Sequence, residues 1–385
     1  MRKGWEYKKL GEICSSDLGK TLNKSKDVGN MHPYLCAINI LWDFIDLTTL
    51  KETCFKDDEI DRYTVKYGDL LVCEGGDTGR AAIWDREEPI LYQNALHRLR
   101  FKEDIDARFI MYNLWHKKQI GEIDNKYSKG VTILHLVKSA LLSIPILLPP
   151  LSTQLSIVSE LDKINELIRL KKEQLKDFDN LAQSIFYEMF GDPVENERGW
   201  EVKKLGEICE VVTGTTPKTN IPEYWGKGHY WVTPAELNDT AVYIDRTERE
   251  ITDEALSKTK LRLLPVGTVL LSSRAPIGKV AITKVEMYCN QGFKNCICSD
   301  SICNKYLFYF LRMMKEYLNS LGRGATFKEI SKSIVESIRI PLPPLPLQNL
   351  FAQRIEQIEH QKAEVQKSIT DLETLLASRM QYWFE

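Results

Sequence analysis

The chain has 385 residues, of which 43% are hydrophobic and 28% charged, and its 52 lysines and arginines nearly balance 54 aspartates and glutamates. This composition excludes a disordered or fibrous chain, and no apolar run reaches the ~18 residues that a membrane-spanning helix needs. The first residues lack an apolar signal core, so we expect a soluble, cytoplasmic protein. The net charge of −2 argues against nucleic-acid binding only if the charges are spread evenly.

The chain contains one sequence pattern twice. Its start, GWEYKKLGEIC at Gly4–Cys14, returns as GWEVKKLGEIC at Gly199–Cys209, an offset of 195. Further matches follow in the same order and end with IPILLPPL at Ile144–Leu151 and IRIPLPPL at Ile338–Leu345. A period this long must hold a whole domain, so the repeat predicts two similar domains in a pseudo-twofold monomer.

The first copy begins with a predicted globular domain, residues 1–151. Short strands such as Ala81–Trp84 alternate with turn residues, and a helix is predicted at Ala107–Ile120. After the prolines, the segment 152–198 has helical periodicity, which predicts one long helix from Ser152 to Phe190 and a short linker.

The second copy repeats this order. The domain 199–345 contains predicted strands at Thr268–Leu271 and Val280–Thr283 and a helix at Ile302–Leu321, and the helical segment 346–385 follows it. The expected fold class is therefore α+β, with two similar globular domains separated by two long helices.

The two long helices carry apolar residues at alternating steps of four and three. A spacing of 3.5 residues over more than four heptads predicts a coiled coil. The alternative is two separate amphipathic helices, each packed on its own domain. Only about eight residues connect the first helix to the second domain, which favours antiparallel pairing. The predicted pairing residues are Ile157, Leu161, Ile164, Ile168, Leu175, Phe178, Phe351, Ile355, Ile358, Val365, Ile369 and Leu372.

Counting charge by segment shows where the acidity lies. The helical segments 152–198 and 346–385 carry 6 basic against 10 acidic and 4 against 6 side chains, whereas 199–345 carries 20 against 16 and 1–151 carries 22 of each. Basic and small polar residues gather in equivalent loops of the two domains, where they suit DNA phosphates and base edges. Ordinary solvated turns are the alternative. The predicted DNA contacts, mostly to phosphate, are Lys20, Lys24, Arg80, Lys129, Thr216, Lys218, Arg274 and Arg323.

The sequence lacks the patterns of a catalytic or metal site. It contains no GxxxxGK[ST] phosphate loop, no GxGxxG after a strand, and no Asp/Asn-Pro-Pro-aromatic tetrapeptide. The cysteines at 289, 296, 298 and 303 include no CxxC and have no nearby histidine, so we interpret them as buried apolar residues rather than zinc ligands. We therefore expect a recognition protein without catalytic residues, metal or cofactor of its own.

These motifs together resemble the specificity subunit of type I restriction-modification systems. The resemblance covers the whole chain and is carried by GWxxKKLGEI at the start of each half, by TGTTP at Thr213–Pro217, by YWVTP at Tyr230–Pro234, by SSRAPIGKVAI, and by IPLPPLPLQ before the last helix. A further matching segment is Asn290-Gln291-Gly292-Phe293. The first half fits less well, because Leu18–Leu22 lacks the proline of TGTTP and Ala95-Leu96 replaces the Gly-Phe pair of that segment.

The resemblance implies two target-recognition domains, each reading half of a bipartite site in double-stranded DNA. It implies that the paired helices set the spacer and bind two modification subunits, which methylate adenine with S-adenosylmethionine. A restriction subunit that translocates DNA would use ATP and Mg²⁺, so every cofactor would lie on partner chains. The alternatives are a stand-alone DNA-binding adaptor or regulator with the same domains and, less well supported, a nuclease.

Overall fold

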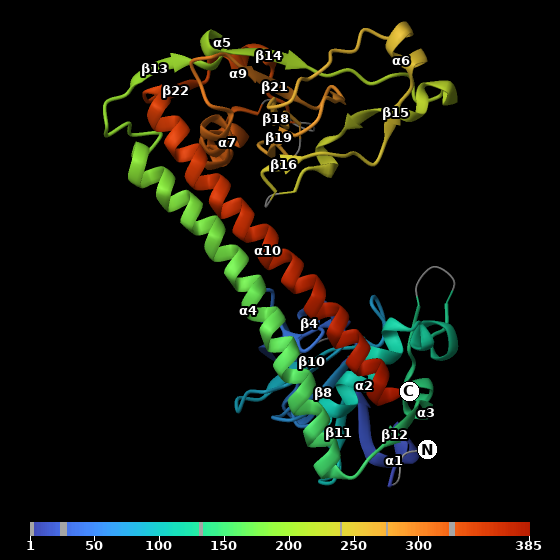
Figure 1. Ribbon diagram of the computed structural model, residues 1–385. Helices are drawn as coiled ribbons and strands as arrows, with labels where there is room; N and C mark the ends of the chain where they lie inside the picture. Colours follow the sequence, from blue (N-terminus) through green and yellow to red (C-terminus); the bar gives the residue numbers. More distant parts are fainter. Residues whose placement is uncertain (1–3, 24–28, 131–133, 239–240, 275, 323–327) are drawn as a thin grey trace. The chain divides into compact units, whose positions relative to one another are not determined.

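The computed structural model describes residues 4–23, 29–130, 134–238, 241–274, 276–322 and 328–385. The chain divides into two compact units (Figure 1). The N-terminal unit combines Met1–Lys171 with Ser368–Glu385, and the C-terminal unit is Lys172–Lys367. Each unit therefore contains one globular domain and a part of each long helix. We call the globular part of the N-terminal unit domain 1 and that of the C-terminal unit domain 2.

Domain 1 is built on two four-stranded sheets, with strand orders β2-β11-β8-β9 and β6-β3-β10-β7. The strands β1 and β12 pair in antiparallel register and bring the start and the end of the domain together. The strands are β1 Glu6–Lys9, β2 Cys14–Leu18, β3 Asn30–Leu35, β4 Ile40–Leu41, β5 Phe44–Ile45, β6 Lys51–Phe55, β7 Thr64–Val65, β8 Leu70–Cys73, β9 Ala81–Ile83, β10 Ile90–Tyr92, β11 Leu96–Phe101 and β12 Pro145–Leu148. The α-helices are α1 Leu10–Ile13, α2 Ala107–Gln119 and α3 Lys138–Ser143.

Domain 2 has sheets of order β14-β21-β18-β19-β16 and β17-β15-β20, and the antiparallel pair β13-β22. Its strands are β13 Glu201–Lys204, β14 Cys209–Thr213, β15 Trp225–Val232, β16 Tyr243–Ile244, β17 Glu250–Ile251, β18 Val269–Leu271, β19 Val280–Thr283, β20 Tyr288–Cys289, β21 Lys294–Cys298 and β22 Arg339–Leu342. Its α-helices are α5 Leu205–Ile208, α6 Asp253–Lys258, α7 Asn304–Met313, α8 Lys315–Leu321 and α9 Lys332–Ser337.

The sequence repeat is a repeat of structure. Four strands of the central sheets match in order, because β2-β11-β8-β9 in domain 1 corresponds to β14-β21-β18-β19 in domain 2, where β16 is added at the edge. The predicted strand Val280–Thr283 is confirmed as β19, and Ala81–Trp84 is one residue longer than β9. The helix predicted at Ile302–Leu321 is present as α7 and α8, which are separated at Met314. The α+β fold with a duplicated domain is thus confirmed.

The long helices α4 (Leu151–Phe190) and α10 (Leu345–Phe384) pack antiparallel. In the C-terminal unit Lys362 lies 3.0 Å from Asp179 across the helix pair, and in the N-terminal unit Arg379 pairs with Glu160. Nine of the predicted pairing residues are buried: Ile157, Leu161, Ile164, Ile168, Phe351, Ile355, Ile358, Val365 and Ile369. Leu175, Phe178 and Leu372 are only half-buried. None of the described helices combines the length and apolar character required to cross a bilayer.

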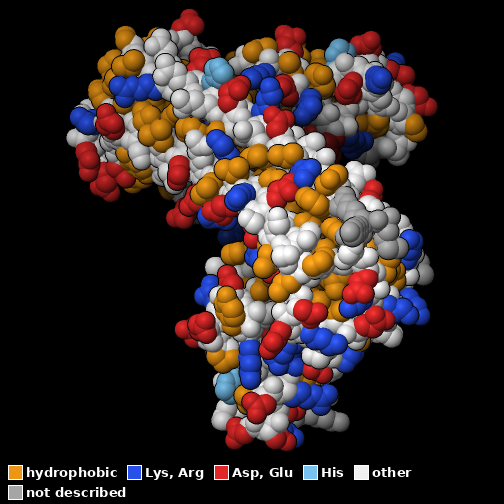
Figure 2. Space-filling view, turned by 60° about the horizontal axis from the view of Figure 1, so that its bottom comes forward, with side chains coloured by type: hydrophobic (Ala, Val, Ile, Leu, Met, Phe, Trp, Pro, Cys, Tyr) orange, Lys and Arg blue, Asp and Glu red, His pale blue; other side chains and the backbone are white. Residues whose placement is uncertain are grey.

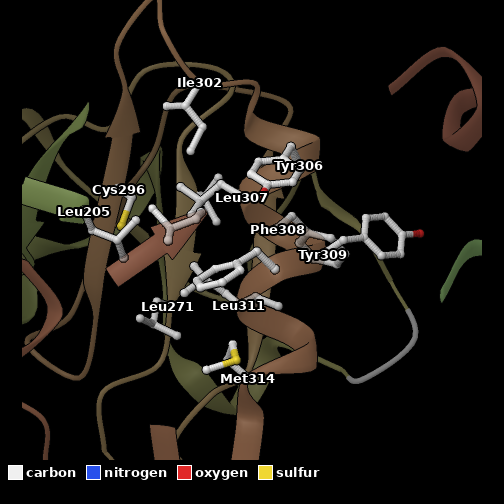
Figure 3. Packing of buried hydrophobic residues seen from close by; sticks show 14 of the residues in the cluster. Leu205, Leu271, Cys296, Ile302, Tyr306, Leu307, Phe308, Tyr309, Leu311 and Met314 are labelled. Atoms are coloured by element: carbon white, nitrogen blue, oxygen red, sulfur yellow. The ribbon is translucent and has the colours of Figure 1, made fainter. Parts of the chain in front are cut away.

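The long helices also pack on the domains, so both interpretations of their apolar residues hold in part. In the C-terminal unit the ring of Phe186 on α4 stacks on Tyr306 of α7, with centroids 5.5 Å apart, and Phe351 of α10 meets Tyr309 edge to face. Figure 3 shows α7 contributing Tyr306, Leu307, Phe308, Tyr309 and Leu311 to this core. A helix that is buried on nearly every side is expected where a sheet and other helices cover it.

A buried glutamine fastens each long helix to its domain. In domain 2 the Gln348 side chain accepts from the backbone N–H of Cys303 at 2.8 Å and donates to the Pro343 carbonyl at 2.7 Å. In domain 1 Gln154 accepts from Asp106 N–H at 2.9 Å and donates to the Pro149 carbonyl at 2.9 Å. Because these bonds join the start of the long helix to the start of α7 or α2, the two copies hold their helices in the same way.

Candidate nucleic-acid interface

The loops that follow β14, β18 and β20 meet at one edge of domain 2. The hydroxyl of Thr216 hydrogen-bonds to Gln291, and the N–H of Ser273 donates to the Gly292 carbonyl at 2.8 Å. A backbone bridge joins Arg274 to Glu329, which precedes α9. Four segments that are distant in sequence therefore form one polar surface, which we call the loop edge of domain 2.

The same loops meet in domain 1, where they form the loop edge of that domain. The N–H of Asn94 donates to the Lys20 carbonyl at 2.9 Å, and the N–H of Glu74 donates to the Ala95 carbonyl at 2.9 Å. The segment ahead of α3 joins this edge through the N–H of Leu136, which donates to the Glu74 carbonyl at 2.7 Å. The repeat has therefore preserved the arrangement of the loops.

Glycine makes the close approach of these loops possible. A Cβ atom on Gly214 would lie 2.1 Å from the Asn290 carbonyl oxygen, and one on Gly19 would lie 2.2 Å from the Gln93 carbonyl carbon. Real Cβ atoms do not approach backbone so closely, so a side chain at either position would push the first loop away from the loop after β20 or β10. These glycines stand at the same place in the two copies.

Lys20, a predicted phosphate contact, lies inside domain 1. Its residue is 5% exposed, and its ammonium Nζ lies 2.8 Å from Glu59 Oε2 and 2.9 Å from the Cys54 carbonyl. The hydrogen bond from Lys20 lowers the pKa of Glu59. Burial and pairing weigh against a contact between Lys20 and DNA.

Arg80 is also engaged within domain 1. Its Nη2 donates to the Ala37 carbonyl at 2.9 Å, and its side chain is 22% exposed. Lys279, at the equivalent position of domain 2, reaches the Leu237 carbonyl at 2.6 Å. This shared bond ties the turn after β8 or β18 to a neighbouring segment, which favours a structural role for Arg80.

The remaining predicted contacts divide into two groups. Lys129, Lys218 and Arg274 are exposed, and Thr216 is half-buried; all four lie in the loops of the two loop edges. Lys24 and Arg323 lie outside the described residues.

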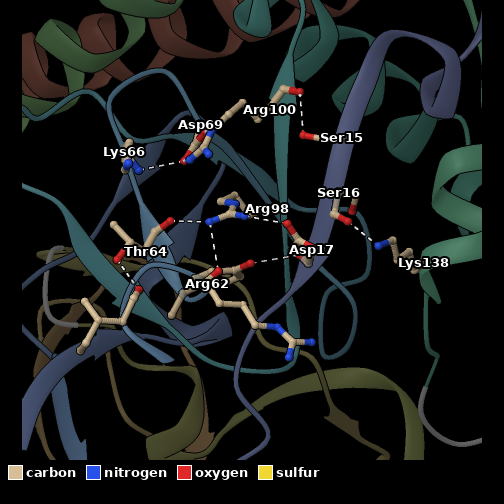
Figure 4. A network of polar contacts seen from close by, with 12 residues as sticks. Ser15, Ser16, Asp17, Arg62, Thr64, Lys66, Asp69, Arg98, Arg100 and Lys138 are labelled. Carbon is tan, nitrogen blue, oxygen red and sulfur yellow. Dashed lines mark hydrogen bonds and ion pairs between the residues drawn. The ribbon is translucent and has the colours of Figure 1, made fainter. Parts of the chain in front are cut away.

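Other cations of domain 1 are paired with its own carboxylates (Figure 4). Arg98 lies 2.7 Å from Asp17, and Arg100 lies 2.6 Å from Asp69. On the face drawn in Figure 2, lysine and arginine side chains are interspersed with aspartate and glutamate side chains. The cations therefore do not form one basic surface on this face.

The loop edges contain charged residues that sequence analysis did not single out. In domain 2 these are Lys294, which is 5% exposed, and Glu329, whose carboxylate contacts both Lys294 and Arg274. Partial burial acts to raise the pKa of Glu329, but hydrogen bonds from the two cations outweigh it and lower the pKa. The sequence signal was available, because Lys294 follows the Asn-Gln-Gly-Phe segment that marks the loop.

Domain 1 carries different chemistry in the same place. His97 stands where domain 2 has Lys294, at the start of the strand that pairs with β8, and its Nε2 lies 2.9 Å from the Leu136 carbonyl. Burial lowers the pKa of His97, so its neutral form is favoured. Gly75 and His135 form the backbone bridge that Arg274 and Glu329 form in domain 2. Two equivalent loop edges thus present different side chains.

The four cysteines considered as zinc ligands in the sequence all lie in domain 2. Cys289 and Cys296 are buried, Cys298 and Cys303 are half-buried, and all nine cysteines of the chain are free thiols. Within the described ranges, no cluster of three or more histidine, cysteine, aspartate or glutamate side chains has a geometry that could hold a metal ion.

Comparison with known proteins gives matches over both copies. A family model described as the type I restriction modification DNA specificity domain matches residues 2–177 and 197–374. The type I restriction enzyme MjaIX specificity subunit of Methanocaldococcus jannaschii is 40% identical over 190 residues, which are 49% of this chain and 44% of that protein. The putative type I restriction enzyme MjaX specificity subunit of the same organism is 26% identical over 383 residues, covering 92% of this chain and 87% of that one.

A solved structure shares the fold of the whole chain. It is described as the structural basis underlying complex assembly and conformational transition of the type I R-M system. The match has a TM-score of 0.61 at 21% identity and covers 100% of this chain and 98% of the other. At this identity the likeness concerns the fold.

Proposed function

Because the chain belongs to the family of type I restriction-modification DNA specificity subunits, we propose that it reads a bipartite DNA sequence, one half with each domain. The observation that carries this proposal is the pair of loop edges, which have the same construction and different side chains. A shared frame with different surface chemistry suits two domains that bind DNA in the same way and recognise different half-sites.

The side chains of the loop edges support this reading. Lys129 and Lys218 are exposed cations that suit phosphates, whereas Gln291 and Asn94 belong to the residue types that read adenine edges. The phosphate contacts would hold each domain in register, and the amide and guanidinium groups would select bases.

The helices α4 and α10 would set the spacer between the half-sites and bind two modification subunits. Leucines on the outward faces of these helices are 44–49% exposed, which suits partner binding. They are Leu155, Leu167, Leu170, Leu181, Leu350 and Leu375. The partners would carry S-adenosylmethionine for adenine methylation, and a restriction subunit would carry ATP and Mg²⁺. This chain would then be the non-catalytic reader of the complex.

Exchange of one domain tests this function. Residues 199–345 are replaced by the matching segment of another specificity subunit, and methylated motifs are mapped in cells that also express the modification subunits. We expect one half of the bipartite motif to change while the other half stays the same. A motif unchanged in both halves contradicts the proposal, and exchange of residues 1–151 is the matched control that must change the opposite half.

A further inference from the structure

Three charged side chains form a connected series at the loop edge of domain 2. The buried ammonium of Lys294 lies 3.2 Å from Ser273 Oγ and 3.2 Å from Glu329 Oε1. The other oxygen of that carboxylate, Oε2, lies 3.1 Å from Arg274 Nε. Lys294 therefore anchors Glu329, and Glu329 anchors Arg274.

The anchored guanidinium keeps donors for a ligand. The side chain of Arg274 is 47% exposed, and its Nε lies against the Glu329 carboxylate. Among the described residues, neither terminal nitrogen of Arg274 has a hydrogen-bond partner. Two parallel N–H donors of an arginine that a carboxylate holds in place match a pair of adjacent acceptors, because a guanidinium is a rigid planar fork.

The carboxylate of Glu329 affects whether Arg274 is better suited to bind a phosphate or a base. Glu329 lies against Arg274 and weakens the attraction of this guanidinium for a phosphate. The O6 and N7 atoms of guanine carry no net charge and accept two parallel hydrogen bonds from arginine in the major groove. A carboxylate that fixes the arginine therefore favours guanine over a backbone contact.

The corresponding place in domain 1 has a different composition. Gly75 and His135 occupy the bridged positions of Arg274 and Glu329, and His97 stands in place of Lys294. None of these three residues carries a guanidinium, so domain 1 cannot read a base in this way at the corresponding positions.

We propose that Arg274 reads a guanine in the half-site bound by domain 2, with Glu329 and Lys294 as its positioning residues. The inference rests on the proposed function and adds the base and the residues that select it.

The test maps methylated motifs for the assembled complex with Arg274→Ala, Arg274→Lys and Glu329→Gln. The matched control is Arg262→Ala, which removes an exposed arginine of domain 2 that is paired with Glu210. Binding is also measured on duplexes in which each G·C pair of the domain 2 half-site is replaced in turn. We expect Arg274→Ala to reduce discrimination at one guanine by about 5- to 150-fold, with the salt dependence of binding unchanged.

The two further variants separate reading from folding. Arg274→Lys retains the charge but not the fork, so it should relax the same position while the other half of the motif is kept. Glu329→Gln should relax that position to a smaller degree. If Arg274→Ala instead weakens binding to all sequences alike and lowers the salt slope by ~1, Arg274 is a phosphate contact and the inference is wrong. An unchanged motif also overturns it, whereas a failed domain exchange would overturn the proposed function itself.

Discussion

Gln154 and Gln348 make equivalent contacts in the two copies. In each side chain the amide oxygen accepts a hydrogen bond and the amide nitrogen donates one. The Gln348 residue is fully buried, and it joins the N–H of Cys303 to the carbonyls of Pro343 and Ser301. A buried side-chain amide is tolerated because its hydrogen bonds to the backbone replace those that it made to water. If the amide is removed, the backbone groups that it paired with stay buried without a partner, which costs free energy.

Gln348→Leu should therefore destabilise the C-terminal unit although it conserves size. The change leaves the Cys303 N–H and the Pro343 carbonyl buried without their partner, for a loss of about 1–3 kcal/mol in the free energy of unfolding. Chemical denaturation of the full chain measures this loss. Gln353→Leu, on the exposed face of the same helix, is the control and should change stability by less than about 0.5 kcal/mol. Equal effects of the two variants would contradict the anchoring role.

Residue type and loop position predict Lys20 and Arg80 as phosphate contacts, but distant partners place them elsewhere. Glu59 lies 39 residues from Lys20 and Ala37 lies 43 residues from Arg80, so only the fold brings these groups together. The predicted position of Arg274 in a loop was correct, whereas its attachment to Glu329 depends on the packing of two segments that the sequence does not connect. The repeat therefore predicts which loops lie together. Hydrogen bonds and ion pairs between residues distant in sequence determine which side chains of these loops remain free to contact DNA.

At the scale of elements, the heptad pattern predicts the two paired helices, and the short connection after the first helix predicts that they run antiparallel. It does not predict that the helix ends also serve as core for the domains. The difference is visible at Phe186, which is 1% exposed although it lies outside the predicted heptad positions, because α7 covers it. A heptad pattern describes one apolar face of a helix, so it does not show that a neighbouring face packs on a domain.

Lengthening both helices by one turn tests their proposed role in spacing. Four residues are inserted after Arg169 in α4 and four after Asp371 in α10, near the facing position between the cross-helix pairs Glu160–Arg379 and Asp179–Lys362. The added length of ~6 Å corresponds to about two base pairs of DNA. We expect the mapped motif to keep both half-sites and to gain about two base pairs of spacer.

The control for this insertion adds four residues after Glu87, in an exposed loop of domain 1, and should leave the spacer unchanged. An active complex with lengthened helices and the original spacer would falsify the role of the helices as a spacer.

At the scale of the whole molecule, the charge balance limits how strongly this chain can hold DNA by itself. The net charge is −2, and Lys20, Arg80, Arg98 and Arg100 contact groups of the same domain. Non-specific affinity for DNA comes chiefly from cations that contact phosphates and release counterions. Few such cations are available among the described residues of the loop edges, so we infer that partner subunits supply much of the affinity.

The isolated chain should accordingly bind its bipartite duplex at least about tenfold more weakly than the complex with modification subunits, a difference of ~1.4 kcal/mol. Fluorescence anisotropy at salt concentrations from about 50 to about 200 mM measures both affinities, because binding that depends on phosphate contacts weakens steeply over this range. The complex should also have the steeper salt dependence. Equal affinities and slopes would show that the chain needs no help to bind DNA.

The N-terminal unit is made of two distant segments of the chain, so it can be completed only late in synthesis. This unit includes Ser368–Glu385, and Phe384 packs on the Phe109 ring at 5.4 Å. Roughly 200 residues separate Lys171 from Ser368, so a ribosome working at ~5–20 residues per second needs about 10–40 s to deliver the missing part. Until the segment Ser368–Glu385 has been made, Phe109 of the first half lacks the ring of Phe384 that packs on it. Loss of the segment Ser368–Glu385 would therefore damage the half that was translated first.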